Sequence, residues 1–484
     1  MAPADPESVP LGELAGHAAS IRIAVIGGGV AGLVAALECA KVGTHVTVFE
    51  SSDALGGTAR TVELDGLPVD MGVDSVTPAL DDRLRDLGLA DALVVPDTET
   101  RWVAGVPGVD AAPLPDDTVL GIPENMFSDQ CRRILGTGGV WRAYADRLRP
   151  PLTIGHEQDL AKLVRTRMGQ KVLDRLVAPL TAGVFGTTPD RIDVDVAAPG
   201  LNAALTRTGS LSGAVAAVRT EGAHVRGLVG GAGRLVDALA QRLQQRDAEL
   251  RCGTTVAALE RTGDAWAVVT ADAELDASDE APGPETFDAV VVACDEAGAR
   301  RLLAAVAPGV SAGAAGDAVA AVETVALVVD APELNDRPRG AEVVTVPGTH
   351  RARSVLHLTA KWGWLAHRAG TGRHVVRLSF DAGVTAGMGD DEVFALARDE
   401  ASALFGITLD ASQVRAAHRA RFIAAPPHAL RGHDAAADHI RRAIDAVPHL
   451  TATGSWLSGS GLAQVVPDAV AAADRLRRRA LFDS

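Results

Sequence analysis

The stretch "IAVIGGGVAGLVAAL", residues Ile23 to Leu37, joins four apolar residues to a glycine cluster and then to an apolar run of helical character. Residues 22–26 have the length and β-branched content of a buried parallel strand. Gly27, Gly29 and Gly32 then match GxGxxG where strand gives way to helix. Gly27 allows a tight turn, Gly29 lets a pyrophosphate approach the backbone, and Gly32 lets helix pack on strand. The pattern predicts a dinucleotide site at a helix N-terminus, where unpaired N–H groups attract phosphate.

The segments that follow indicate which dinucleotide is bound. "HVTVFE", His45 to Glu50, reads as a second strand that ends in an acid at the position expected to hold ribose hydroxyls. Gly56, Gly57 and Arg60 come shortly after the acid. A nicotinamide domain needs no second glycine pair at this point, whereas FAD lies extended across its domain and needs close backbone approach again. The sequence therefore favours FAD.

The far end of the chain supports the same prediction. "LTATGSWLSGSGLAQVVPDAVAAADRL", Leu450 to Leu476, has a strand-like start, a loop with Gly454, Gly459 and Gly461, and an Ala-rich helix. A loop that leads into a helix N-terminus can place N–H groups at the electron-rich edge of a reduced flavin. We expect the two ends to share one FAD-binding domain, with insertions between them.

Composition limits the classes of protein and partner. The 484 residues exceed one ordinary core, and the formal charge of −16 argues against a nucleic-acid partner. The four cysteines form no CxxC pair, which favours a reduced cytoplasmic setting over a zinc site or a disulfide framework. No uncharged apolar run reaches roughly 18 residues, so no membrane span is predicted. Residues 1–20 read as a flexible tail because they lack the plan of a signal peptide.

The middle of the chain predicts two insertions. Residues 156–185 carry apolar side chains at helical spacing, and β-like runs recur from about Val322 to Phe380. The fold class predicted is α/β, with a discontinuous Rossmann-like FAD-binding domain, a mixed-sheet substrate domain and a helical insertion. The predicted FAD-binding domain comprises 21–82, 225–300 and 415–484, the substrate-binding domain 83–117, 197–224 and 301–414, and the helical insertion 118–196.

The chain resembles the flavin amine-oxidase superfamily and, within it, the bacterial type of oxygen-dependent protoporphyrinogen or coproporphyrinogen oxidase. The superfamily resemblance rests on the first glycine motif, on "FESSDALGGTARTVELDGLPVDMG" and on "GSWLSGSGLAQVV". The narrower resemblance rests on four segments in the family's order. They are "RWVAGVPGVDAAPLPDDTVLGIP" (101–123), "VLDRLVAPLTAGVFGTTPDRIDV" (172–194), "LTAKWGW" and "PPHALRGH" ending at His433.

The resemblance implies FAD as cofactor and dehydrogenation of a porphyrinogen with O2 as acceptor, giving H2O2. It also implies that Arg101 holds a substrate propionate, since a guanidinium matches a carboxylate bidentately. No catalytic acid or base and no metal ligand is assigned. Taken together, the glycine patterns and the resemblance predict FAD contacts from Gly27, Gly28, Gly29, Val30, Ala31, Gly32, Glu50, Ser51, Gly57, Thr58, Arg60, Gly72, Val73, Asp74, Ser75, Val256, Phe422, Gly454, Ser460, Gly461 and Leu462.

Other members of the same superfamily fit the sequence less well. An amine or amino-acid oxidase of this superfamily commonly has two tyrosines beside the flavin and a lysine near flavin N5. This chain has one tyrosine, Tyr144, and Thr324 stands near the expected lysine position. The porphyrinogen-like segments disfavour a carotenoid desaturase, and intact glycines at both ends argue against a non-catalytic carrier of the prenyl-protein escort type.

Some points stay open at this stage. The chain departs from the family's Pro-Gln-Tyr, since it reads Pro427-His428-Ala429. His428 and His433 are predicted to be packing or surface residues, because no carboxylate accompanies them in this reading. The sequence does not distinguish coproporphyrinogen III from protoporphyrinogen IX and does not give an oligomeric state. It also leaves open whether the apolar run "LVAPLTAGVF" packs internally or makes a peripheral contact with the inner face of a membrane.

Overall fold

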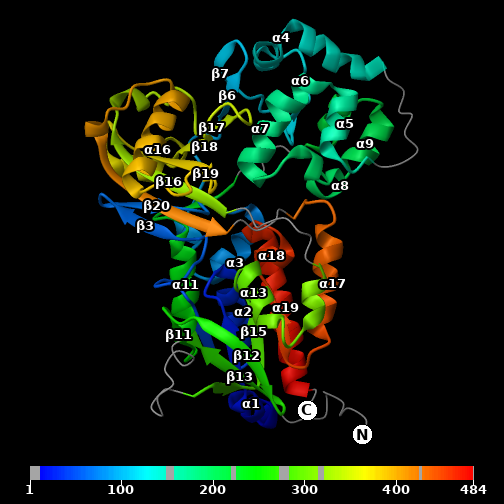
Figure 1. The fold of residues 1–484 in the computed structure, drawn as a ribbon, viewed down its shortest axis with the longest axis vertical. Helices are drawn as coiled ribbons and strands as arrows, with labels where there is room; N and C mark the ends of the chain where they lie inside the picture. The colour runs from blue at the N-terminus through cyan, green and yellow to red at the C-terminus, as the bar shows by residue number, and fades with distance from the viewer. Residues whose placement is uncertain are drawn as a thin grey trace.

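The computed structural model describes residues 11–148, 157–219, 225–271, 283–313, 321–423 and 428–482. Figure 1 shows a parallel sheet with its helices in the lower half of the view, a larger sheet at the upper left and a group of helices at the upper right. This arrangement confirms the predicted fold class.

The lower sheet has five strands, and every neighbouring pair in it is parallel. The strand that comes first in the chain covers Arg22–Ile26, as the sequence predicts. All of its residues except Arg22 are buried, because helices and strands cover both faces of the sheet. In spatial order the strands are β11 (Glu249–Arg251), β2 (His45–Phe49), β1 (Arg22–Ile26), β15 (Ala289–Val292) and β21 (Leu450–Ala452).

Two layers cover this sheet. One face packs against α2 (Val30–Ala40), α11 (Gly233–Gln244) and α19 (Leu462–Phe482). Every residue of α2 is buried, which explains why its sequence is almost wholly apolar. The other face packs against a three-stranded sheet and two helices. These are β12 (Val256–Thr262), β13 (Ala265–Thr270), β14 (Glu285–Phe287), α13 (Glu296–Leu303) and α17 (His433–Asp445).

The second sheet has seven strands and is mixed, because β17 pairs with β6 in parallel while the other pairs are antiparallel. In spatial order the strands are β20 (Val414–Ile423), β16 (Ala321–Asp330), β19 (Arg373–Asp381), β18 (Ala352–His357), β17 (Glu342–Thr345), β6 (Arg101–Val106) and β7 (Val109–Pro113). Helix α16 (Asp390–Phe405) packs on one face. The other face meets α14 (Leu358–Lys361), α15 (Gly363–Ala369) and the hairpin of β3 (Thr61–Leu64) and β4 (Leu67–Asp70).

One predicted boundary needs correction. The prediction assigned residues from 415 onward to the FAD-binding domain, yet β20 pairs with β16 from Ala321 to Val329. Backbone pairing over that length makes β20 the edge strand of the seven-stranded sheet. Residues 415–423 therefore belong to the seven-stranded sheet rather than to the parallel one.

The helical insertion forms a third core against β6, β7 and the short β9 (Ile122–Pro123). Leu176 and Val177, which begin the apolar run 176–185, are fully buried in this core, so this part of the run packs internally. The predicted insertion 118–196 contains α4 (Asp129–Tyr144), α5 (Leu160–Arg167), α6 (Gln170–Val172), α7 (Ala178–Leu180) and the start of α8 (Val194–Ala197). Helices α9 (Leu201–Thr208) and α10 (Leu211–Val218), predicted as part of the substrate-binding domain, pack into the same core. The remaining short elements are α3 (Asp81–Asp86), β5 (Leu93–Val94), β8 (Thr118–Val119), β10 (Gly227–Leu228) and α18 (Ser455–Ser458).

The predicted flexible tail is wrong for its second half. Residues Leu11–Ser20 form α1, Ala18 is buried, and the helix packs against α19. A helix that buries a side chain on its neighbour is held in place, which composition alone did not reveal. Residues 1–10 lie outside the described residues. Among the helices that the structure describes, none has the length and apolar character needed to cross a bilayer.

A cavity of about 290 Å³ lies beside α15, where β18 ends and β19 begins, and it contains a buried histidine pair. His357 Nε2 faces His374 Nδ1 at 3.1 Å, and His374 Nε2 lies 3.2 Å from the Asn335 side-chain oxygen. Burial lowers the pKa of His357 to about 3, with a further contribution from His374, and it lowers the pKa of His374 to about 4. Both rings are therefore neutral in the folded chain at pH 7.

This pair predicts acid-sensitive stability. An unfolded histidine has a pKa near 6.5, so between pH 7 and pH 5 the unfolded chain gains protons that the folded chain does not. The free energy of unfolding should fall by about 2 kcal/mol for each histidine over that range. Urea unfolding of the wild-type chain and of His374→Gln at both pH values measures the effect. The variant should lose about half of this pH dependence, and an equal slope in the two chains would contradict the assignment.

Candidate cofactor site

The predicted glycine loops meet at the carboxyl edge of the parallel sheet. The Gly27 N–H donates to the Phe49 carbonyl at 2.8 Å, which joins the ends of β1 and β2. Across the other side, Ala293 N–H donates to Ile26 O at 2.8 Å and Thr453 N–H donates to Val292 O at 3.0 Å. Four strand ends thus deliver their loops to one place, the usual location of a ligand in a parallel α/β sheet.

Each of the three positions of the first motif favours glycine for a different physical reason. Gly27 has φ of +112°, and a Cβ there would lie 2.6 Å from the Ala293 carbonyl oxygen. A Cβ on Gly32 would overlap the Gly27 carbonyl, so this glycine lets α2 approach the loop. Gly29 differs, because it has φ of −70° and no atom of the chain lies within 4 Å of an added Cβ. The space beside Gly29 is therefore open, as a pyrophosphate against the backbone requires.

Glu50 is held against this loop. Its Oε2 accepts a hydrogen bond from Gly28 N–H at 2.7 Å, and its Oε1 accepts from Ser52 N–H at 2.8 Å and Ser52 Oγ at 2.7 Å. Ser51, another predicted FAD contact, makes a longer contact with Glu50, because its Oγ lies 3.5 Å from Glu50 Oε1. Sequence reasoning missed Ser52, whose two hydrogen bonds orient the carboxylate that was assigned to ribose.

The second glycine pair packs directly on the first loop. Gly56 N–H donates to Gly28 O at 2.8 Å, and a Cβ on Gly57 would lie 3.4 Å from the Gly29 Cα. Both glycines have positive φ, of +113° and +58°. Arg60 instead pairs with exposed Asp53 at 2.8 Å, so the structure gives it a surface partner.

The predicted contacts from Gly72 to Ser75 lie against the segment that follows the second glycine pair. Val73 N–H donates to Thr58 O at 2.9 Å, which ties the predicted contacts Val73 and Thr58 together. A Cβ on Gly72 would overlap the Thr58 carbonyl, so the close approach needs glycine. Sequence reasoning missed Asp70 just before it. Burial raises the pKa of Asp70 to about 6, and its carboxylate accepts from Ala232 N–H at 2.9 Å at the start of α11.

Asp74 joins the cofactor segment to the seven-stranded sheet. Lys361 Nζ lies 2.5 Å from Asp74 Oδ2, and an Arg377 nitrogen lies 3.6 Å from Oδ1. Burial pushes the pKa of Asp74 upward, but the charges of Lys361 and Arg377 outweigh burial and hold that pKa below its ordinary value. Lys361 comes from "LTAKWGW", one of the segments on which the family resemblance rests, although the resemblance predicts no role for this lysine. Thr324 lies nearby and donates to Met71 O at 2.8 Å.

The remaining predicted contacts come from three elements. Val256 is buried at the start of β12, and nearby Thr254 N–H donates to Glu50 O at 2.8 Å. Phe422 lies on β20 opposite Val322. The last loop, from Gly454 to Leu462, contains α18 and leads into α19. Gly454, Gly459 and Gly461 all have positive φ, which explains this glycine spacing.

Arg101 lies apart from these loops. It is the first residue of β6 in the other sheet, it is half exposed, and its Nε donates to Glu342 Oε2 at 2.7 Å. In the part of the chain that the structure describes, no hydrogen bond or ion pair links Arg101 to the predicted cofactor contacts. The Glu342 carboxylate holds the guanidinium by Nε and leaves its two terminal nitrogens for a ligand.

A parallel sheet with glycine loops at its carboxyl edge, an acid held at the first loop and open space beside Gly29 is the arrangement of a dinucleotide-binding enzyme domain. The family of flavin-containing amine oxidoreductases matches residues 30–476, and the chain belongs to this family. The open space beside Gly29 and the carboxylate of Glu50 against the first loop fit the dinucleotide part of FAD.

Known proteins resemble the chain along most of its length. It is 31% identical to the coproporphyrinogen III oxidase of Mycobacterium tuberculosis H37Rv, covering 93% of this chain and 95% of that protein. Identity to the coproporphyrinogen III oxidase of Mycobacterium leprae is 30%, covering 93% and 96%. Among solved structures, one from Exiguobacterium sp. 255-15 described as "Putative protoporphyrinogen oxidase" superposes with a TM-score of 0.80 at 22% identity, covering 95% and 99%.

Proposed function

We propose that this chain is a FAD-dependent oxidase that dehydrogenates a porphyrinogen, coproporphyrinogen III or protoporphyrinogen IX, to the porphyrin. Each dehydrogenation removes a hydride and a proton, and it is balanced by reduction of one O2 to one H2O2. The observation that carries the proposal is the 31% identity to a coproporphyrinogen III oxidase over 93% of the chain, and the open glycine loop held by Glu50 supports it.

The residues of the chain bind and orient rather than react. Bound FAD supplies the two-electron acceptor for oxidation of a C–H bond. Glu50 and the Gly27–Gly32 loop hold the dinucleotide, while the loop from Gly454 to Leu462 offers backbone N–H groups to the ring system. The seven-stranded sheet supplies the substrate side of the site. The terminal nitrogens of Arg101 are suited to a propionate, with Glu342 fixing the plane of the guanidinium.

An amine oxidase is the second candidate, and one observation disfavours it. Thr324 stands near the position where amine oxidases of this superfamily carry a lysine, and its hydroxyl bonds to the backbone of the cofactor segment. A putrescine oxidase variant superposes with a TM-score of 0.64 at 15% identity, which shows shared fold alone.

The proposal includes a cytoplasmic location, because the four cysteines are all free thiols, namely Cys39, Cys131, Cys252 and Cys294. Burial raises the pKa of the first two thiols to about 12 and about 11, so they are small core residues rather than reactive ones.

The test is anaerobic mixing of the purified yellow protein with coproporphyrinogen III, protoporphyrinogen IX or putrescine. We expect either tetrapyrrole to bleach the flavin absorbance, with porphyrin fluorescence appearing when oxygen is admitted, and the faster one identifies the substrate. Bleaching by putrescine and by neither tetrapyrrole would overturn the proposal in favour of an amine oxidase.

Arg101 allows the substrate assignment to be tested in the same assay. Arg101→Ala should keep its flavin and raise the KM for a carboxylated porphyrinogen by about tenfold or more, because a charge-assisted bidentate contact is lost. Arg101→Lys keeps the charge and should show a smaller rise. Equal KM values in all three proteins would remove Arg101 from the substrate site.

A further inference from the structure

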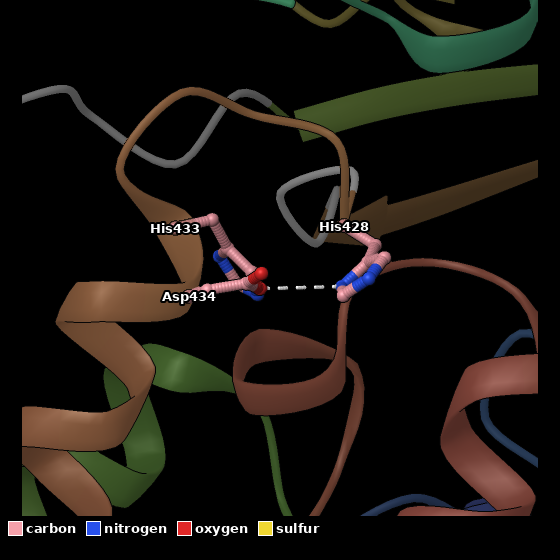
Figure 2. Close-up of side chains that lie close together, drawn as sticks. All are labelled: His428, His433 and Asp434. Carbon is pink, nitrogen blue, oxygen red and sulfur yellow. Dashed lines mark ion pairs between the residues drawn. The ribbon is translucent and has the colours of Figure 1, made fainter. Parts of the chain in front are cut away.

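His428, His433 and Asp434 form a compact cluster beside the last cofactor loop. Figure 2 shows the three side chains converging, with His433 and Asp434 at the first turn of α17 and His428 on the turn that precedes it. One nitrogen of each imidazole and one carboxylate oxygen all lie within 4.8 Å of one another. The prediction that these histidines lack a carboxylate is therefore wrong, because Asp434 follows His433 directly in the chain.

His433 is the fixed member of the cluster. It is 8% exposed, and its Nε2 donates a hydrogen bond to the Leu457 carbonyl at 3.2 Å. A carbonyl oxygen only accepts, so this bond places the ring proton on Nε2 and leaves the lone pair on Nδ1. Metal-binding histidines are commonly oriented in this way, by a hydrogen bond from one nitrogen to a backbone carbonyl.

His428 and Asp434 are the adjustable members. His428 Nδ1 lies 3.5 Å from Asp434 Oδ1, and their side chains are 42% and 60% exposed. Bonds of about 2.0–2.2 Å to a tetrahedral ion place ligand atoms about 3.3–3.6 Å apart. The 3.5 Å pair already meets this requirement, and rotation of two half-exposed side chains can bring the remaining atoms closer. The Asp434 carboxylate also offsets the partial positive charge of the helix N-terminus.

The surroundings leave the cluster available for a cation. Arg441 is the guanidinium that reaches Leu457 O, at 3.2 Å, and its charge is balanced by Asp468 at 2.9 Å. The backbone of His428 is fixed against Gly459, since a Cβ on that glycine would overlap it. The cluster is thus built onto the loop that carries predicted flavin contacts Ser460 to Leu462, while using none of them.

We propose that His428, His433 and Asp434 bind one divalent cation of the zinc class. Two imidazoles and one carboxylate suit Zn²⁺, Co²⁺ and Ni²⁺ better than Mg²⁺ or Ca²⁺, which prefer oxygen ligands. A set of three protein ligands leaves coordination positions for water or for a carboxylate of a bound molecule. The site is assigned by the geometry of the chain itself and does not depend on which substrate the enzyme oxidises.

The test is calorimetric titration of the tag-free, chelator-treated holoenzyme with Zn²⁺, repeated with Co²⁺ and followed by visible absorption. We expect one ion per chain with a Kd on the order of micromolar or tighter. His428→Gln and Asp434→Asn should each weaken binding by about tenfold or more, because each removes a ligand at a surface position and leaves the buried His433 in place. His367→Gln, at an exposed histidine on α15, is the matched control and should bind as the wild type does.

Two results would overturn the site. Absence of one-to-one binding by the wild-type chain would do so, and so would equal affinity in the wild type, His428→Gln and Asp434→Asn. Flavin content, read from the visible spectrum of each protein, verifies that all variants compared are folded holoenzymes.

Discussion

Gly29→Ala should give a chain that folds but does not retain FAD. The backbone at Gly29 has φ of −70° and ψ of 173°, which alanine adopts without strain, and an added methyl group meets no atom of the chain. The methyl would instead occupy the space in which a pyrophosphate approaches the loop. We expect FAD affinity to fall by about 100-fold or more, or about 2.7 kcal/mol, in fluorescence titration of the deflavinated protein.

Substitution of Gly32, in the same motif, is a useful contrast to Gly29→Ala. A methyl group on Gly32 overlaps the Gly27 carbonyl, so Gly32→Ala should lower the thermal stability of the apoprotein itself. Gly16→Ala, on the surface of α1 with no atom near the added carbon, should lower neither property, because alanine favours a helix interior over glycine. Unaltered FAD affinity in Gly29→Ala would show that the open space beside the loop is not the phosphate cradle.

Lys361→Met should destabilise the fold by about 3 kcal/mol. The substitution removes the 2.5 Å partner of the buried Asp74 carboxylate and leaves it with Arg377, 3.6 Å away, and a buried charge that loses its nearest partner is costly. The side chains of both residues are only about a tenth exposed, so water does not replace the lost partner. Urea unfolding of the single variant gives the cost directly. The variant should also bind FAD more weakly, since Asp74 belongs to the cofactor segment.

A double-mutant cycle separates the ion pair from other effects of the substitution. Asp74→Asn combined with Lys361→Met should cost less than the sum of the two single changes, because the double variant has no unpaired carboxylate. Arg85→Met removes the partner of exposed Asp82 and is the surface control, with no measurable change expected. Additive costs at Asp74 and Lys361 would mean that their attraction does not stabilise the protein.

The parts of the fold that local sequence specifies were predicted well. The β-branched run before Gly27 and the acid at Glu50 mark β1 and β2, because a buried parallel strand and its loop need those residue types at those places. The apolar spacing of residues 156–185 likewise predicts the helices found there, such as α5.

The errors come from features that depend on distant partners. β20 reads equally well as part of either sheet, and only its pairing with β16 decides. The sequence of α1 resembles a flexible tail, because the helix on which it packs, α19, lies more than 400 residues later in the chain. The carboxylate beside His428 and His433 was missed for a different reason. Asp434 is adjacent to His433 in sequence, but the first turn of α17 sets the direction in which its carboxylate points.

The packing of α19 on α2 also has a consequence for biosynthesis. Helix α2 is made early and is wholly buried, yet part of its cover is α19, with Arg477 donating to the Glu38 carbonyl at 2.6 Å. Until α19 has been synthesised, the nascent chain therefore carries an apolar helix with one side uncovered. The loop from Gly454 to Leu462 is made just before α19. Loading with FAD through that loop must follow its synthesis, and until then the exposed helix is a surface that chaperones would recognise.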